Sequence, residues 1–354
     1  MIPHNKPYIS KNAYKIIKLV IKSGYINYST ISREVEHKLS NLLYQESNKA
    51  TLVINGTSAL FLALRALNIE NNDEVIIPSY TCTALLNAIN LVGAKAIIVD
   101  VSRENLSFNK NLLEPYISDK IKAIIVVHTF GIACELEDIK TLNIPIIEDC
   151  SQALGSRFSD GSLVGSKGDI SVFSFYATKL ITGGIGGAIT SKHKNITDFI
   201  KDYINFDSPE IYKSRFNFQI SDINSAIIVS GLNELDKILK KKRKIAREYL
   251  KVIDSKYAKI VGINNFRFLI EFNNKESLLY CQKCLDFVGI KTIIPIENHE
   301  LLHRYLNLDF NNYPNSEYLS CNILSIPIFA NLSKTEIKHI KRSLYDCISS
   351  STCI

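Results

Sequence analysis

The sequence contains 354 residues, of which 46% are hydrophobic, and its formal net charge is +7. A chain of this length exceeds the usual size of one hydrophobic core, so we expect two domains that share a cleft. No stretch reaches the roughly 20 apolar residues that a membrane-spanning helix needs, and the N-terminus lacks a secretion-signal pattern, so we expect a cytoplasmic protein without membrane insertion.

The positive charge is spread along the chain, apart from one dense cluster at residues 240–244. A basic cluster on a helix is usually a solvated face, and no nucleic-acid-binding motif accompanies this one. We therefore expect no nucleic-acid partner. A diffuse positive field suits a small anionic substrate instead.

Seven apolar runs rich in Val and Ile alternate with helical or turn segments, which is typical of an α/β fold with a mostly parallel sheet and helices on both faces. The run at residues 123–127 is apolar throughout, which indicates burial on both faces. Ligands of such sheets bind beyond the carboxyl ends of the strands. The predicted strands are residues 51–54, 74–77, 95–100, 123–128, 144–147, 171–174 and 187–190.

The last third of the chain has a different pattern. A long helical segment is predicted over residues 222–253, followed by a strand at 266–272 and a final helix from Ser333. We expect a large domain at residues 1–236, which includes an N-terminal arm, and a smaller C-terminal α+β domain at residues 237–354. A helix is expected to cross this boundary.

Lys179 and Asp149 form the most informative pair of residues. Lys179 closes an apolar run and precedes the glycine-rich segment 182–187, and Asp149 lies at the end of the strand 144–147. A lysine amine can bond to the aldehyde of pyridoxal phosphate, and a carboxylate can keep the pyridine nitrogen protonated. Each residue also has a simpler interpretation, as an exposed lysine or a helix-capping aspartate. Together they predict a pyridoxal 5'-phosphate site.

A phosphate cradle is predicted at Asn55, Gly56, Thr57 and Ser58, because these residues follow the strand 51–54 and open a strong helix-forming segment. Backbone N–H groups at a helix start bind phosphate well. Ser174, five residues before the lysine, can add a further hydroxyl group.

Other polar residues have competing interpretations. His128 ends a predicted strand, so we expect it to face the cleft with Asp149. It could be an acid or base, but a histidine satisfied by neighbouring backbone is favoured. Cys281 and Cys284 have metal or redox spacing, but they stand alone on a predicted helix, so we expect apolar packing, no metal site and no disulfide framework. The glycines at 183–187 are expected to let the backbone pass close to the cofactor.

These residues resemble the DegT-type sugar aminotransferases, which are fold-type-I enzymes that use pyridoxal phosphate to aminate nucleotide-linked keto-sugars. The resemblance covers most of the chain in order and spacing. It rests on residues 56–60, 73–78, 93–94, 99–100, 127–131, 148–153, 174–175, 179, 186–187, 217–222, 243, 246, 249 and 324–328.

The resemblance implies a role for each of these positions. Lys179 would carry the cofactor, Asp149 would pair with the pyridine nitrogen, and Gln152 would contact the ring hydroxyl. Gly56, Thr57, Ser58 and Ser174 would hold the phosphate. Asn217 would reach the same phosphate from the second subunit, which implies a homodimer with shared active sites.

Three positions depart from the family pattern. Cys82 stands where the family usually stacks an aromatic ring on the cofactor, and Tyr80 lies two positions away, roughly 6.6 Å along the strand. The family's arginine after the second-subunit asparagine is Gln219 here, and its usual acidic residue before the paired glycines is Ile185. These departures concern ring stacking and substrate contacts, and the predicted cofactor set is intact.

The resemblance implies an aminotransferase that moves an amino group from glutamate to a nucleotide-linked keto-deoxy sugar, for polysaccharide, glycan or antibiotic sugars. A sugar dehydratase that uses the same cofactor is disfavoured, because the family's deoxygenating relatives replace the lysine with histidine. A non-catalytic sensor is disfavoured because Lys179 and Asp149 are both present. The nucleotide, the keto-sugar and the ring position are left open.

Overall fold

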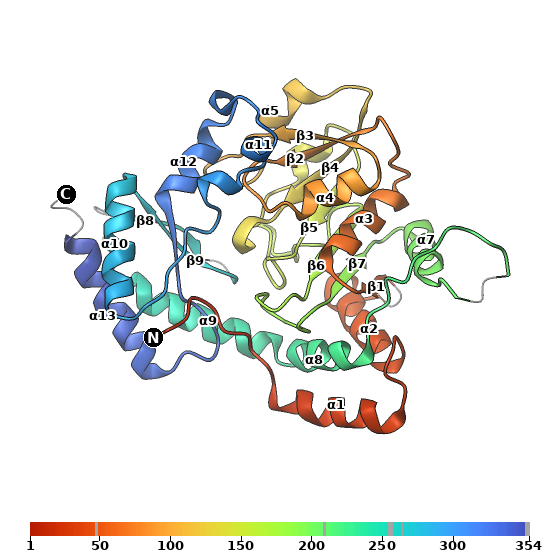
Figure 1. Ribbon diagram of the computed structural model, residues 1–354, viewed down its shortest axis with the longest axis horizontal. Coiled ribbons are helices and arrows are strands. Elements are labelled where there is room, and N and C mark those ends of the chain that lie inside the picture. The colour runs from red at the N-terminus through yellow and green to blue at the C-terminus, as the bar shows by residue number, and fades with distance from the viewer. Residues whose placement is uncertain (47–48, 208–209, 254–257, 264, 351–354) are drawn as a thin grey trace.

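The computed structural model describes residues 1–46, 49–207, 210–253, 258–263 and 265–350 (Figure 1). These residues form a seven-stranded sheet and a three-stranded sheet. All seven strands predicted for the large sheet are confirmed, with ends that agree within two residues. They are β1 (Ala50–Val53), β2 (Glu74–Pro78), β3 (Lys95–Val99), β4 (Ile121–Val127), β5 (Ile146–Asp149), β6 (Ile170–Ser174) and β7 (Gly187–Thr190).

The strand order in the large sheet is β1-β7-β6-β5-β4-β2-β3. Neighbouring strands are parallel except at β7, which runs antiparallel to both β1 and β6. The carboxyl ends of six strands and the start of β7 therefore share one edge of the sheet. Ligands of open α/β sheets bind at this edge.

Helices cover both faces of the large sheet, as predicted. One face is buried under α3 (Gly56–Ala66), α4 (Ala84–Leu91) and α7 (Lys194–Ile204). The other is buried under α2 (Thr30–Tyr44) and α8 (Asp222–Leu232), and α1 (Lys11–Ser23) lies alongside α8 (Figure 1). Short helical turns complete this domain: α5 (Lys110–Leu113), η1 (Glu114–Tyr116), η2 (Thr129–Gly131) and α6 (Glu137–Lys140).

The long helix predicted over residues 222–253 is broken into α8 and α9 (Leu235–Leu250). Asn233 and Glu234 separate the two helices. The Glu234 carboxylate accepts hydrogen bonds from the hydroxyl groups of Tyr8 and Ser10 in the N-terminal arm. The N-terminal arm is therefore hydrogen-bonded to a residue that lies between the two helices.

The three-stranded sheet belongs to the C-terminal part of the chain. Its order is β10-β9-β8, and both pairs are antiparallel. The predicted strand at 266–272 and the predicted final helix are confirmed as β9 and α13. The elements are β8 (Ala258–Ile263), β9 (Phe268–Phe272), β10 (Ile323–Ile326), α10 (Lys275–Phe287), η3 (Asn298–Glu300), α11 (Leu302–Tyr305), η4 (Phe310–Asn312), α12 (Pro314–Asn322) and α13 (Lys334–Ser350).

Two segments connect the hydrophobic cores. The first half of α9 places Leu235 and Ile238 in the core of the large sheet, and its second half places Ala246 and Tyr249 in the core of the small sheet. The N-terminal arm also reaches the small-sheet core through Ile2, which pairs with Ile290. The predicted domain boundary at residue 236 falls at the start of α9 and stays a prediction.

The expectation that the basic cluster at 240–244 is a solvated helix face is wrong for one member. Lys242 is only 5% exposed and lies on the buried face of α9, because it follows Ile238 and precedes Ile245 at helical spacing. The other four basic residues of the cluster are exposed.

Cys281 is buried on α10 and Cys284 is half-buried there, both as free thiols. Neither belongs to a group of potential metal ligands among the described residues. None of the helices that the structure describes is long and apolar enough to span a membrane.

Candidate active site

A cavity of about 210 Å³ opens at the carboxyl edge of the large sheet. Six of the eight site residues predicted from the sequence line it: Gly56, Thr57, Asp149, Gln152, Ser174 and Lys179. They come from the ends of β5 and β6, the turn after β5, the start of α3 and the loop after β6. The topology of the sheet therefore brings together residues that are more than 100 positions apart.

The start of α3 forms one end of this cavity. Asn55 caps the helix by accepting the N–H of Ser58 at 2.8 Å, and its carbonyl accepts the N–H of Ala59. Among the described residues, no acceptor pairs with the N–H groups of Gly56 and Thr57. Two free donors at the positive end of a helix dipole suit a phosphate group.

An added Cβ atom would meet close neighbours at two glycines beside this helix start. A Cβ atom on Gly56 would lie 3.1 Å from the Cβ atom of Ser174. A Cβ atom on Gly187 would lie 2.3 Å from the Asn55 carbonyl oxygen and 2.8 Å from the Gly56 nitrogen. The start of β7 thus packs directly against the turn that opens α3, as the expected close passage of the backbone requires.

Asp149 ends β5 and is 5% exposed. One of its carboxylate oxygens accepts the N–H of Ser151 at 2.9 Å. Gln152 follows in the same turn, where its side-chain oxygen accepts the N–H of Phe130 at 3.0 Å. A buried carboxylate at one end of the cavity can hold a protonated ring nitrogen, while the amide N–H₂ of Gln152 remains a donor.

Lys179 lies on a turn that its own N–H closes onto the carbonyl of Tyr176 at 2.9 Å. Burial lowers the pKa of its amine, and the negative charge of Asp149 acts in the opposite direction. A lowered pKa increases the fraction of neutral amine, which is the form that attacks a carbonyl group. The residues present therefore fit pyridoxal phosphate in charge, donors and nucleophile.

Cys82 lies in the cavity wall, and Tyr80 does not. Tyr80 is fully buried in a separate cluster, where its ring meets Phe130 edge to face at 6.0 Å. Burial and the nearby Asp149 raise the pKa of the Cys82 thiol. At position 82, therefore, a neutral thiol and not an aromatic ring stands in the cavity wall.

A family model described as the DegT/DnrJ/EryC1/StrS aminotransferase family matches residues 7–345. The chain belongs to this family. The membership confirms the predicted resemblance and the predicted enzyme class, an aminotransferase.

Three curated members of the family are similar in sequence. The GDP-perosamine synthase of Escherichia coli O157:H7 is 39% identical over 218 residues, which are 58% of this chain and 59% of that protein. The GDP-perosamine synthase of Vibrio cholerae is 32% identical over 70% of each chain. The dTDP-3-amino-3,6-dideoxy-alpha-D-galactopyranose transaminase of Aneurinibacillus thermoaerophilus is 30% identical over 93% of each.

Solved structures share the fold. A sugar aminotransferase of Streptococcus pneumoniae, solved in apo, PMP and PLP forms, is 23% identical; its apo form has a TM-score of 0.92 over 99% of this chain and 98% of that chain. A Helicobacter pylori aminotransferase involved in the biosynthesis of pseudoaminic acid is also 23% identical, with a TM-score of 0.88 over 99% of each chain. The predicted fold-type-I architecture is thereby confirmed.

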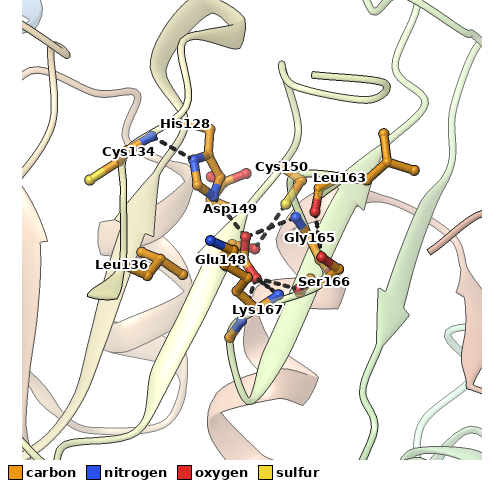
Figure 2. Close-up of polar contacts among 12 residues, drawn as sticks. His128, Cys134, Leu136, Glu148, Asp149, Cys150, Leu163, Gly165, Ser166 and Lys167 are labelled. Atoms are coloured by element: carbon orange, nitrogen blue, oxygen red, sulfur yellow. Dashed lines mark hydrogen bonds and ion pairs between the residues drawn. The ribbon is translucent and has the colours of Figure 1, made fainter. Parts of the chain in front are cut away.

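In this aminotransferase the expectation that His128 faces the cleft is wrong. His128 is fully buried, its Nε2 atom lies 3.0 Å from Glu148 Oε2, and its Nδ1 atom accepts the N–H of Cys134 at 3.1 Å (Figure 2). Because Nδ1 accepts, the proton is on Nε2 and is donated to Glu148. The neighbouring backbone therefore satisfies only the Nδ1 atom. The partner of the Nε2 atom is the Glu148 side chain, which lies on the adjacent strand β5.

The Glu148 side chain binds the backbone of the segment 165–168. Its two carboxylate oxygens accept N–H groups of Gly165, Lys167 and Gly168 (Figure 2). Burial acts to raise its pKa, but the hydrogen bonds from His128 and these N–H groups outweigh burial and lower it. Glu148 is therefore a buried, fully bonded carboxylate next to the cavity residue Asp149.

His128, Glu148 and Cys150 are the one group of potential metal ligands found in the described parts of the chain, with ligand atoms within 4.8 Å of one another. The acceptor positions of Glu148 are already occupied by hydrogen-bond donors. Burial and the Glu148 charge raise the pKa of the Cys150 thiol well above its ordinary value, so the sulfur stays protonated. This group is a structural network and does not fit a metal.

Two predicted site residues lie outside the cavity wall. Ser58 contributes its N–H to the Asn55 cap. Asn217 is exposed, and its side-chain oxygen accepts the N–H of Gln219 at 3.2 Å. Sequence reasoning also missed cavity residues that carry no motif of their own, among them Thr81, Ser151 and Tyr176. Asn55 belongs to the predicted cradle and also lines the cavity.

Proposed function

We propose that this chain is a pyridoxal phosphate-dependent aminotransferase that transfers an amino group from glutamate to a nucleotide-linked keto-deoxy sugar. The observation that carries the proposal is the single cavity that holds the Lys179 amine, the Asp149 carboxylate and the free N–H groups of Gly56 and Thr57. The names of the curated relatives, two GDP-perosamine synthases and a dTDP-amino-sugar transaminase, support a nucleotide-linked deoxy sugar as acceptor.

The chain's residues divide the work between holding the cofactor and moving a proton. When bound, pyridoxal phosphate supplies the electron sink that stabilises negative charge at the substrate carbon. Gly56, Thr57 and Ser174 would hold the phosphate, and Asp149 would keep the ring nitrogen protonated. Lys179 would hold the cofactor covalently, and its free amine would serve as the proton carrier at the substrate carbon.

The visible spectrum of the purified protein tests this proposal. We expect an absorbance band from the lysine-bound cofactor that bleaches when glutamate is added and returns with 2-oxoglutarate. Lys179→Ala should retain noncovalently bound cofactor but show no steady-state transamination, because both the covalent attachment and the proton carrier are removed. Undiminished transamination by Lys179→Ala would overturn the assignment.

We also propose a homodimer in which Asn217 completes the phosphate site of the partner subunit. Asn217 lies outside its own cavity, and the segment before it exposes Ile211 (71%), Tyr212 (91%) and Phe216 (51%). Exposed apolar side chains grouped in this way favour a protein interface. An obligate dimer of this kind should bury over about 2,000 Å² in total.

Complementation tests the shared site. Mixed dimers of Lys179→Ala and Asn217→Asp subunits should recover activity, because one of the two sites receives an intact lysine and an intact asparagine. Mass measurement verifies that mixed dimers form. Mixed dimers without recovered activity, although each parent is inactive, would contradict the proposal.

We place the enzyme in the cytoplasm. The described residues include seven free cysteines, among them the buried Cys134, Cys150 and Cys281. Free thiols in this number are typical of a reducing compartment.

A further inference from the structure

A second cavity, of about 160 Å³, lies beside the cofactor cavity and shares Lys179 with it. Its walls come from the N-terminal arm, the loop that carries Lys179, helix α9 and the small sheet. The arm is held against the lysine loop because the side-chain amide of Asn5 donates to the Thr178 carbonyl at 2.9 Å. We call this space the second cavity.

The described walls of the second cavity contain basic side chains and no carboxylate. The basic residues are His4, Lys6, Lys179, Lys242 and Arg267. They come from four different segments of the chain, so helix periodicity or a local charge run does not explain their convergence. The lysine and arginine side chains of this group converge on a partly enclosed space, and positive charge arranged in this way is complementary to an anion.

Three of these cations surround one aromatic ring. The Nζ atoms of Lys179 and Lys242 lie 5.7 Å and 5.9 Å from the centroid of the Phe266 ring, and the Arg267 guanidinium carbon lies 5.4 Å from it. Lys242 is fixed in place because its amine donates to the Phe266 carbonyl at 2.8 Å. A lysine amine has three N–H groups, so donors remain for a ligand.

The arm and the small sheet support the guanidinium. Arg267 Nη1 lies 3.4 Å from His4 Nε2 and 3.5 Å from Ser325 Oγ, and His4 Nε2 lies 2.9 Å from the same hydroxyl. These contacts order the guanidinium at the wall of the second cavity through an imidazole and a hydroxyl group.

The pKa values reflect this crowding of positive charge. Burial, followed by the nearby Arg267, lowers the pKa of Lys242 to about 7. Burial lowers the pKa of Arg267 to about 10, and burial together with the two cations lowers the pKa of His4 to about 3. An anion bound in the second cavity would lower the cost of holding these charges out of water.

We propose that the second cavity binds a carboxylate group of the dicarboxylic amino donor, and of the 2-oxo acid that it becomes, through Lys242 and Arg267. This inference rests on the proposed function, because the donor's amino group must reach the position of Lys179. A donor bound there has its carboxylates within a few bonds of the shared lysine. A nucleotide does not fit, since the volume lies below the roughly 300–1,000 Å³ of pockets for larger ligands.

The binding of glutarate tests the proposal without requiring turnover. Glutarate is a dicarboxylate without an amino group, and its affinity for the cofactor-loaded protein can be measured by calorimetry. We expect Lys242→Met and Arg267→Gln each to weaken binding about 10- to 100-fold, the loss typical of a hydrogen bond to a charged group. The control Lys240→Met removes an exposed lysine from the same helix and should bind glutarate as the unchanged protein does.

Folding and nucleotide binding are checked on the same protein samples. Met is close to Lys in length and is apolar, so replacing a buried cation with it should not unfold the protein. GDP is titrated in parallel as a probe for the diphosphate of a nucleotide-linked sugar. Weakened glutarate binding with unchanged GDP binding supports the proposal. Unchanged glutarate affinity in both variants, absent glutarate binding by the unchanged protein, or a selective loss of GDP affinity overturns it.

Failure of this proposal is distinguishable from failure of the proposed function. If glutamate bleaches the unchanged protein but the variants bind glutarate normally, only the assignment of Lys242 and Arg267 is wrong. If no amino acid bleaches the unchanged protein, the aminotransferase proposal fails, and the glutarate titration still decides whether the second cavity binds a dicarboxylate.

Discussion

Gly187 provides the sharpest test of how the fold builds the phosphate site. In Gly187→Ala the added methyl carbon would lie 2.3 Å from the Asn55 carbonyl oxygen and 2.4 Å from the carbonyl carbon. Ordinary contact begins at 3.4 Å, so the two backbone segments must separate by about 1.1 Å (3.4 minus 2.3). Both partners are backbone atoms, and neither can be relieved by a side-chain rotation.

This separation has two measurable effects. Overpacking of this kind costs about 1–3 kcal/mol of unfolding free energy, which urea denaturation measures. Moving Asn55 also moves the N–H groups of Gly56 and Thr57, and the loss of one charge-assisted hydrogen bond should weaken cofactor binding about 10- to 100-fold. Equilibrium dialysis against pyridoxal phosphate measures the second effect.

Gly161→Ala is the matched control. Gly161 has φ +85°, and no heavy atom lies within 4 Å of the position that its Cβ atom would take, so alanine there meets only the left-handed backbone penalty of about 1–2 kcal/mol. The substitution should lower stability and leave cofactor affinity unchanged. If Gly187→Ala binds the cofactor as the unchanged protein does, the close approach of β7 does not set the phosphate site.

Two further outcomes follow from the electrostatics. Asp149→Ala should reduce the transamination rate far more than it reduces stability in urea, because the ring nitrogen loses its proton; activity within a few-fold of the unchanged enzyme would make Asp149 only a turn-forming residue. Lys242→Met should stabilise the ligand-free protein by up to about 4–5 kcal/mol at pH 7, and by progressively less as the pH rises towards 10.5. The substitution stabilises because the folded-state pKa of Lys242, about 7, lies below the ordinary value of 10.5, so the unfolded chain binds more protons between these pH values. A gain in unfolding free energy that is the same at pH 7 and pH 9.5 would contradict this reasoning.

The strands of the large sheet could be predicted because strands that are buried on both faces of a sheet have continuous apolar sequences. The segment 123–127 is an example, and it lies within β4 in the middle of the sheet. The antiparallel direction of β7 could not be predicted in the same way. Strand direction depends on which strands become neighbours, and Gly187 to Thr190 carries no local signal for that choice.

The cofactor side of the site was accessible to sequence reasoning, and the second cavity was not. Asp149 ends β5, Gly56 begins α3, and Lys179 lies between the end of β6 and a glycine-rich segment, so local patterns locate all three. Lys242 is hidden in a run of five basic residues, although its spacing from Ile238 and Ile245 assigns it to the buried face. Arg267 precedes β9, and nothing in its neighbourhood indicates that the strand faces the lysine loop.

The two cavities are formed by different parts of the chain. The cofactor cavity is built from residues between Asn55 and Lys179, which one sheet holds rigidly. The second cavity depends on the arm, α9 and the small sheet, whose positions are set by contacts between both hydrophobic cores. Changes in the first set should therefore alter cofactor affinity and the chemical step, whereas changes at Lys242 or Arg267 should alter donor affinity with little effect on cofactor affinity. Among the described residues Lys179 is the one common to both walls, so a donor bound in the second cavity would reach the cofactor where the two parts of the chain meet.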